Sequence, residues 1–351
     1  MTSSPPPVTH PFDAVLIVAF GGPGGLADIR PFLANVLRGR RISSDRLEEV
    51  VRHYERFGGI SPITEITMRQ ARGVAQRLAA RELKLPVYVG MRNWHPLLPD
   101  TLRAMAADGV QRAIGVVLAA HRSYSSCTQY RQNVLDARSD AVAAGLRDVS
   151  VTYVGDWHTH AKFIEVNARH VRAALDRLPD EVHAGARVVF TAHSVPTAMS
   201  GSARYQQQIT DSARLVANAA GVQDWVVVFQ SRSGRPEDPW LGPDVCEYLR
   251  EAADGVPAVV LAPIGFVCDH IEVLYDLDYE AAEVCLEVGL PMVRAETVND
   301  DPMFLDMAAD VVLEVWNRYR SGQPLPIVPS SPPERTEGPP PSRTGRHGVI
   351  E

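Results

Sequence analysis

The sequence predicts an α/β fold with two domains, each built on a four-stranded parallel sheet flanked by helices. Short runs rich in valine and other apolar residues alternate with longer amphipathic segments, which is the pattern of strand–helix units. The strand-like runs are apolar almost throughout, as in parallel strands that are covered on both faces. There are eight such runs, and 351 residues of which 45% are hydrophobic are enough for two cores.

The expected elements follow one another in a regular order. Strands are expected at 14–20, 86–92, 112–120, 149–155, 186–192, 224–230, 258–266 and 290–296. The clearest helical periodicities lie at 66–84, 128–146, 163–178 and 205–221. Eight strands in two sets of four suggest two domains.

A weak internal repeat supports this division. The segment 14–25 (AVLIVAFGGPGG) resembles 187–198 (RVVFTAHSVPTA), and 115–126 (GVVLAAHRSYSS) resembles 258–269 (AVVLAPIGFVCD), in the same order. The first copy is longer by roughly thirty residues, so we expect an insertion at about 31–62. An insertion that follows the first strand would lie at the mouth of a cleft between the domains.

The domain limits follow from these patterns and from two polar tails. The carboxyl-terminal stretch is dense in proline, serine and glycine, a composition that cannot bury enough apolar surface to fold. We expect a disordered tail at 1–10, a first domain at 11–148, a second at 149–300, a helix at 301–321 that packs back on the first domain, and a disordered tail at 322–351.

Composition excludes several classes of protein. The net charge of −7 and the pI near 5.9 argue against a nucleic-acid partner. No apolar run is long enough to span a membrane, and the amino terminus lacks the pattern of a secretory signal. These features predict a cytoplasmic protein without a membrane span.

The four cysteines, Cys127, Cys246, Cys268 and Cys285, include no CxxC pair. They therefore indicate neither a disulfide framework nor a zinc knuckle. The simplest interpretation is reduced and mostly buried thiols, although a cluster bound by four distant thiolates stays open at this point.

The most informative segment is GFVCDHIEVLYDLDYE, residues 265–280. Glu272, Asp276 and Glu280 are spaced four residues apart, so one helical face presents a row of carboxylates. Like charges at this spacing destabilise a helix by about 0.2–0.5 kcal/mol per pair. The row is either a solvated acidic face or a site for a cation, and its position after a buried strand favours the cation, because ligands of α/β sheets bind there.

His193 follows the strand expected at 186–192, so it should face the same cleft as the acids. A histidine after a strand is often only a hydrogen-bonded structural residue. A neutral imidazole opposite a carboxylate such as Glu272 can, however, bind a divalent metal and accept a proton near neutral pH.

Two further motifs concern anions. Arg38, Arg40 and Arg41 lie within four residues of one another, and they either complement a helix dipole or recognise carboxylates. The FGGPGG segment at 20–25 follows a strand but departs from the dinucleotide fingerprint, and no GxxxxGK[ST] motif is present. Nucleotide binding is therefore not favoured.

Taken together, the motifs resemble those of bacterial ferrochelatases, which insert ferrous iron into a porphyrin. The resemblance covers roughly residues 12–320. It depends on LRGR, YERFGGISPIT, SYSSCTQY, TAHSVP, QSRSG, PWLGPDV and GFVCDHIEVLYDLDYE, in this order. It implies the chelatase fold, which has two Rossmann-like domains.

The resemblance also implies roles for individual residues. His193 matches the histidine that binds metal and accepts a proton, and Glu272 matches the glutamate that faces it. Asp276 and Glu280 match an acidic row that guides metal or protons. The porphyrin contacts implied in the same way are Ser61, Tyr130, Tyr54 and Arg38.

Two departures from the family pattern matter. Many relatives have a tyrosine after the first strand, where this chain has Phe20, which cannot bind a metal. Some relatives hold an iron–sulfur cluster with cysteines near the HSVP motif and in the carboxyl-terminal extension. This chain has no cysteine in its tail and none between His193 and Cys246, so we expect no cluster and no other cofactor.

The resemblance implies insertion of Fe(II) into coproporphyrin III, with release of two protons, in heme b biosynthesis. The polar, arginine-bearing mouth and the acidic composition favour this substrate over protoporphyrin IX. The alternatives are a protoporphyrin IX ferrochelatase, a cobalt or nickel chelatase of another tetrapyrrole, and a carrier of haem or metal without activity. We expect a monomer, with a downstream coproheme-processing enzyme as a further partner.

Overall fold

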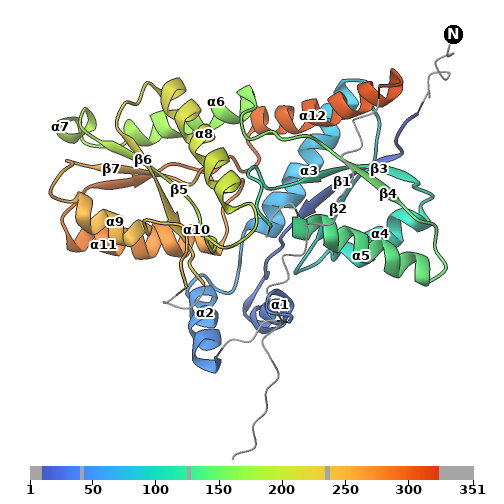
Figure 1. Cartoon of the computed structure of the whole chain (residues 1–351), viewed down its shortest axis with the longest axis horizontal. Helices are drawn as coiled ribbons and strands as arrows, with labels where there is room; N and C mark the ends of the chain where they lie inside the picture. The colour runs from blue at the N-terminus through green and yellow to red at the C-terminus, as the bar shows by residue number, and fades with distance from the viewer. Residues whose placement is uncertain (1–9, 40–42, 125–127, 234–237, 324–351) are drawn as a thin grey trace, which may run out of the picture.

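Two four-stranded parallel sheets form the centre of the computed structural model (Figure 1). The structure describes residues 10–39, 43–124, 128–233 and 238–323. The tails expected at the two ends of the chain lie almost wholly outside these residues. The predicted α/β fold with two parallel sheets of four strands is confirmed.

The two sheets have the same topology. The first contains β1 (Ala14–Ala19), β2 (Val87–Met91), β3 (Arg112–Val117) and β4 (Ser150–Tyr153), in the order β2-β1-β3-β4. The second contains β5 (Arg187–His193), β6 (Trp225–Gln230), β7 (Val259–Ala262) and β8 (Met292–Arg294), in the order β6-β5-β7-β8. The strand order thus repeats between the domains, in agreement with the internal repeat of the sequence.

The domain boundary expected between residues 148 and 149 is wrong by one strand. β4 pairs with β3 in parallel, with Arg112 opposite Ser150. The polar segment before β4 has the composition of a linker, but the strand that follows it covers the open edge of β3. The first domain therefore continues through Tyr153.

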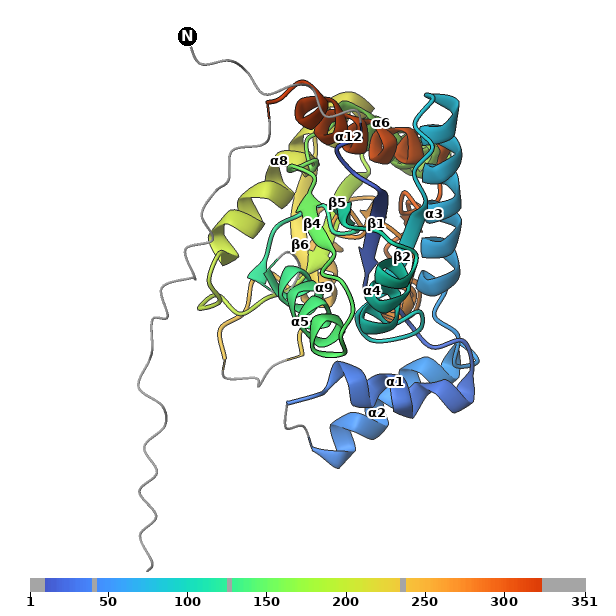
Figure 2. The same ribbon diagram turned by 90° about the vertical axis from the view of Figure 1, so that its right-hand side faces the viewer.

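Helices cover both faces of each sheet (Figures 1 and 2). On the first sheet they are α3 (Ile63–Ala80) and α12 (Pro302–Arg320) on one face, and α4 (Leu98–Ala107) and α5 (Gln129–Ala143) on the other. On the second they are α6 (Ala161–Leu175) and α8 (Ser202–Ala220) on one face, and α9 (Val245–Ala252), α10 (Ile271–Tyr275) and α11 (Ala282–Glu287) on the other. The short helix α7 (Asp180–His183) precedes β5.

The strands alternate between two cores, as the pleat of a strand requires. In β1, Val15 and Ile17 belong to the largest core, whereas Leu16 and Val18 belong to a smaller core against α4 and α5. The largest core also contains Phe190 of β5, so it runs through both domains. α12 contacts both α3 and α6, and this shared apolar packing joins the domains.

The insertion after β1 folds into a short 3₁₀ turn (Leu26–Asp28), α1 (Ile29–Val36) and α2 (Ser44–Arg56). Figure 1 shows α1 and α2 projecting from one side of the molecule. The two ends of the insertion meet where Gly24 bridges Ile60 and the amide of Ser61 donates to the carbonyl of Pro23, at 2.9 Å. The insertion therefore begins and ends beside the carboxyl end of β1.

Gly265 brings the loop after β7 against β5. Its amide donates to the carbonyl of Thr191 at 3.0 Å, and a Cβ atom at this position would lie 2.5 Å from the Cβ of Ala192. Such an approach leaves no room for any side chain, so the loop that leads to α10 is held against the end of β5.

We predict that Gly265→Ala lowers the free energy of unfolding by about 1–3 kcal/mol, because the added methyl group must displace backbone atoms. Thermal unfolding followed by circular dichroism measures the loss. Gly155→Ala is the matched control, since no atom lies within 4 Å of its added Cβ. Equal melting temperatures for the two variants would contradict the close packing.

Candidate active site

His193 is the last residue of β5, and its ring is oriented by a backbone group. The Nδ1 atom forms a hydrogen bond with the carbonyl oxygen of Ser194. Because a carbonyl can only accept, Nδ1 carries the proton of the neutral ring. The Nε2 atom is thereby left with a free lone pair, which is the form that binds a metal or accepts a proton.

Glu272 faces this lone pair from α10. The distance from His193 Nε2 to Glu272 Oε2 is 3.8 Å, and the two side chains are 33% and 43% exposed. Bonds from a divalent metal to an imidazole nitrogen and to a carboxylate oxygen are each about 2.0–2.2 Å long. One ion can therefore lie between the two groups without a large rearrangement, and solvent reaches the position.

His270 is a neighbour of Glu272 that the sequence analysis did not select. Its Nε2 atom lies 3.6 Å from Glu272 Oε2, and its side chain is mostly buried. Among the described residues, none forms a hydrogen bond with its Nδ1 atom. The signal was present in the sequence, because His270 stands two residues before Glu272 in the DHIE motif.

The charge of Glu272 depends on these two rings. Burial alone raises its pKa, but His193 and His270, which are positively charged when protonated at low pH, outweigh that effect and lower it. Glu272 therefore stays ionised near neutral pH. An ionised carboxylate and a nitrogen lone pair side by side can both act as ligands of a divalent cation.

Asp276 and Glu280 lie on a π-helix (Asp276–Ala281) that continues α10. Its i→i+5 hydrogen bonds make a wider turn than an α-helix, so residues four apart stay closer to one line. The row of carboxylates predicted from the sequence is therefore present, but a π-helix rather than an α-helix carries its second half.

The second carboxylate of the row favours its neutral form. Burial raises the pKa of Asp276 to about 8, and the charges of Glu272 and Glu280 act in the same direction. Hydrogen bonds donated by Ser231 Oγ and Gln230 Nε2 to Asp276 Oδ2 oppose the rise. A group of this kind can take up and release protons near neutral pH.

The pKa of Glu280 is also raised, by burial and by the charges of Asp244 and Glu49. It lines a cavity of about 300 Å³ at the far end of the row. The other residues that line this cavity are Gln230, Ser231, Asp244, Val245, Cys246, Arg250, Asp276 and Val284. The row thus leads from the position between His193 and Glu272 to a cavity that has room for several water molecules.

Gln230 connects the two sides of the site, and the sequence analysis also missed it. It stands opposite His193 in the parallel pairing of β5 and β6. Its Nε2 atom donates to the carbonyl of Glu272 at 2.8 Å and to Asp276. Gln230 is 1% exposed, so it fixes the start of the site helix to β6, the strand that pairs with the one that carries His193.

α2 closes over the site from the inserted segment. The ring of His53 stacks on Tyr275 with centroids 3.6 Å apart, and the guanidinium of Arg56 lies 3.4 Å from the ring centre of Tyr279. Tyr54 lies between His53 and Arg56 in the sequence of α2. Burial raises the pKa of its hydroxyl, and the negative charges of Glu272 and Asp276 add to the rise. The structure therefore brings Tyr54 to the same side as the acids.

Phe20 and Ser61 lie together beside the start of the insertion. Phe20 follows β1 and meets Phe32 edge to face, with ring centroids 6.2 Å apart. Ser61 is buried, and its Cβ lies 2.7 Å from the position of a Cβ on Gly22. Phe20 also packs against Cys268, which belongs to the loop that leads to α10.

The other residues predicted to contact the porphyrin, Tyr130 and Arg38, lie on or beside helices of the first domain. Tyr130 is buried on α5, within the core beneath the first sheet. Arg38 is exposed just after α1, where its Nη2 atom donates to Asn35 at 2.8 Å. Arg40 and Arg41 lie outside the described residues.

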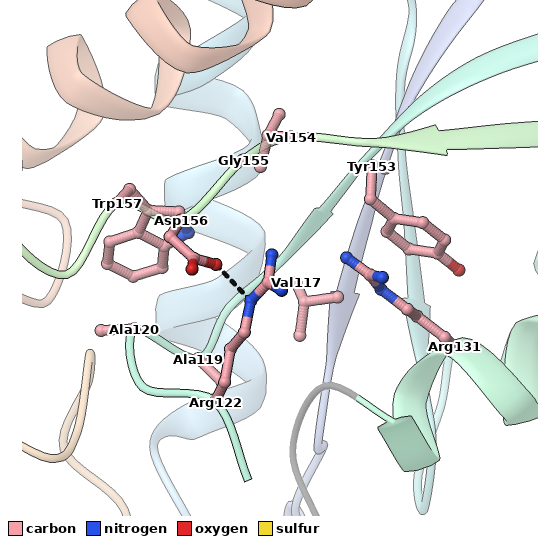
Figure 3. A pocket seen from close by; sticks show the side chains of 11 residues that line it. Val117, Ala119, Ala120, Arg122, Arg131, Tyr153, Val154, Gly155, Asp156 and Trp157 are labelled. Carbon is pink, nitrogen blue, oxygen red and sulfur yellow. Dashed lines mark ion pairs between the residues drawn. The ribbon is translucent and has the colours of Figure 1, made fainter. Parts of the chain in front are cut away.

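A second cavity, at the carboxyl ends of β3 and β4, is too small for a ligand. Figure 3 shows Arg122 and Asp156 directed toward each other across it, and Arg131 against the ring of Tyr153. Its volume is about 20 Å³, which is room for one water molecule.

The fold places His193, Glu272 and a row of carboxylates at the carboxyl ends of the strands of the second domain. A family model described as Ferrochelatase matches residues 12–315. The chain belongs to the ferrochelatase family, as the sequence motifs predicted.

Curated relatives support this membership along most of the chain. The chain is 44% identical over 320 residues to the coproporphyrin III ferrochelatase of Streptomyces griseus, covering 87% of this chain and 85% of the relative. It is 46% identical to the protein of the same name from Streptomyces coelicolor, covering 91% and 89%. A ferrochelatase of Rhodopirellula baltica is 43% identical, covering 87% and 86%.

Solved structures agree on the fold. SirB from Bacillus subtilis with Fe3+ aligns with a TM-score of 0.55 at 12% identity, covering 88% of this chain and 97% of that chain. This likeness concerns the arrangement of the two domains alone. Among the described helices, none has the length and apolar content that a membrane span needs.

We predict that Asp276→Asn makes the protein more stable at neutral pH. The carboxyl ionises at about pH 4 in the unfolded chain and about pH 8 in the fold, so the folded state holds an extra proton between these values. Stability therefore falls as the pH rises from about 4 to about 8. An amide is never ionised, so the variant escapes this loss.

The expected gain at pH 7.5 is about 1–2 kcal/mol, less than the full shift would give because water reaches the cleft. Urea unfolding at several pH values measures it, and the difference should vanish at about pH 4. Asp254→Asn, at an exposed position, serves as the control. A constant difference between wild type and Asp276→Asn at all pH values would contradict the assignment.

Proposed function

We propose that the protein inserts Fe(II) into coproporphyrin III and releases coproheme and two protons. The single observation that supports this most strongly is the apposition of His193 Nε2 and Glu272 Oε2 at 3.8 Å, where a row of carboxylates begins. The names of the Streptomyces relatives support the choice of porphyrin. The enzyme is a lyase that contributes to heme b biosynthesis.

The metal site follows from the donors present. His193 offers one nitrogen and Glu272 one carboxylate oxygen, a small mixed set that binds a borderline cation with moderate affinity. Moderate affinity is required because the ion must leave the protein for the porphyrin. A closed cage of four protein ligands would retain the ion instead.

Proton transfer follows from the pKa values. The free-base porphyrin loses two pyrrole N–H protons, and Fe(II) takes their place, so both protons must leave the closed site. His193 Nε2 accepts a proton once the ion has left its lone pair for the porphyrin, since this lone pair faces the cleft. Asp276, with a pKa raised to about 8, relays protons outward to Glu280 and the cavity beyond it.

The porphyrin is held by the first domain and the insertion. Tyr54 lies against the acid row and Ser61 beside Phe20, and Arg38 is exposed at the mouth. Tyr130 is buried beneath the first sheet, so its contact with the porphyrin rests on the family resemblance alone. Phe20 offers a flat apolar surface with no donor for the metal. Binding energy at the ring edge would bend the macrocycle and expose a pyrrole nitrogen to the ion.

The choice between porphyrins depends on carboxylates. Coproporphyrin III carries four propionates, and protoporphyrin IX carries two together with two apolar vinyl groups. An exposed arginine such as Arg38 binds a carboxylate in a bidentate manner, and the chain has no run of apolar residues with which to anchor a mouth in a membrane. We place the enzyme in the cytoplasm as a monomer whose product passes to a coproheme-processing enzyme.

We expect no iron–sulfur cluster, and the places of the described cysteines support this. Cys268 is buried between the domains, whereas Cys246 and Cys285 pack into the core of the second domain. Cys127 lies outside the described residues, and we expect the enzyme to need no cofactor.

The test is anaerobic insertion of Fe(II) into coproporphyrin III and into protoporphyrin IX in parallel, followed by visible absorption over many turnovers. We expect kcat/KM to be at least about tenfold higher with coproporphyrin III, because an extra charge-assisted hydrogen bond contributes about 1.5–3 kcal/mol. A preference for protoporphyrin IX would contradict the substrate. Uptake of one equivalent without turnover would indicate a carrier, and turnover only with cobalt or nickel would indicate another chelatase.

A further inference from the structure

Arg294 joins the two ends of the segment that carries the acid row. It is the last residue of β8, at the edge of the second sheet. Its Nη1 atom donates to Asp269 Oδ1 at 3.1 Å, and its Nε atom donates to Asp278 Oδ1. Asp269 precedes α10, whereas Asp278 lies within the π-helix. One planar guanidinium thus bridges the start and the middle of this segment.

Arg294 and Asp269 are the more buried side chains of this bridge, and Asp269 accepts further hydrogen bonds. The side chains of Arg294 and Asp269 are 15% and 19% exposed. Asp269 also accepts hydrogen bonds from Thr297 Oγ1 at 3.1 Å and from Asn299 Nδ2 at 3.2 Å. Its own amide donates to Asn299 Oδ1 at 2.9 Å. The amino-terminal end of the segment is therefore fixed to the chain that follows β8.

The position of the bridge relates it to the reaction. Glu272 follows Asp269 by three residues, at the start of α10, and Asp278 stands between Asp276 and Glu280 in the π-helix. A change in the separation of Asp269 and Asp278 would move Glu272 relative to the other two acids. It would also change the distance between Glu272 and His193, because β5 and β8 are separate strands of one sheet.

We propose that Arg294 is a positioning residue for the iron substrate, acting through Asp269 and Asp278 to hold Glu272 and the acid row in register with His193. The inference builds on the proposed function and names the part of the second domain that sets the affinity for the metal. Groups that support metal ligands typically change metal affinity or activity by about 10- to 100-fold when removed.

The geometry requires an arginine. A guanidinium presents Nε and Nη1 in a fixed plane, so it meets two carboxylates at once, whereas a lysine ammonium is a single point charge. The charge of Arg294 is occupied by Asp269 and Asp278, which are not part of the acid row. The carboxylates of Glu272, Asp276 and Glu280 therefore remain available to a cation.

The test measures the KM for Fe(II) and the KM for porphyrin separately in Arg294→Gln, Arg294→Lys and Asp278→Asn. We expect the KM for Fe(II) to rise about 10- to 100-fold in Arg294→Gln, with the KM for porphyrin changed less than about twofold. Asp278→Asn keeps the shape of the side chain and should show a smaller rise in the same direction. The Arg294→Gln and Asp278→Asn effects should be non-additive in the double variant, because the two residues act as a pair.

The control is Arg187→Gln. Arg187 begins β5 in the same sheet and binds Asp224 at 2.7 Å and the hydroxyl of Tyr248 at 2.9 Å, so its loss also breaks a partly buried pair. It should lower stability without changing the KM for Fe(II). An unchanged KM for Fe(II) in folded Arg294→Gln and Asp278→Asn would overturn the proposal, as would equal rises in both KM values.

Calorimetric titration of porphyrin-free protein with Co(II) separates this inference from the proposed function. Weaker Co(II) binding in Arg294→Gln than in Arg187→Gln supports the positioning role even if the wild type inserts no iron. Equal Co(II) affinity in the two variants, together with normal insertion by the wild type, refutes the positioning role and leaves the proposed function intact.

Discussion

The site depends on one constraint, the close approach of the loop after β7 to the carboxyl end of β5. His193 ends β5 and Glu272 begins the helix that follows the loop, and they meet because Gly265 lets the two backbones touch. Gln230 then ties the carbonyl of Glu272 to the neighbouring strand. Parallel strands bring their carboxyl ends to one edge, and this edge faces the inserted helices.

The same arrangement has a cost in stability. Three carboxylates in a row, partly shielded from water, repel one another, and the raised pKa of Asp276 shows that the fold favours its neutral form. A structure selected for stability alone would place an amide there. The penalty is reasonable for a site that must attract a divalent cation, exchange protons near neutral pH and release both, since activity often retains destabilising groups.

The sequence alone predicts the two sheets, the insertion and the acid row, because each depends on local patterns. The facing pair of His193 and Glu272 is predicted from the internal repeat and the family resemblance. It does not predict His270 or Gln230, whose roles arise from strand pairing and from a helix that starts beside them. The boundary at residue 148 fails for a related reason, since the pairing of β4 with β3 is a long-range contact. The spacing of the acids does not predict the π-helix either, because acids four residues apart would also form a row on an α-helix.

The central claim is that His193 handles the metal and a proton while other residues hold the porphyrin. The most direct measurement is therefore made on one preparation of His193→Ala, in which coproporphyrin binding is titrated by fluorescence and anaerobic Fe(II) insertion is then timed. The account predicts unchanged porphyrin affinity and a loss of insertion of about 100-fold or more, the usual contribution of a positioned acid–base group. Insertion at the wild-type rate by a variant that binds porphyrin normally would contradict it.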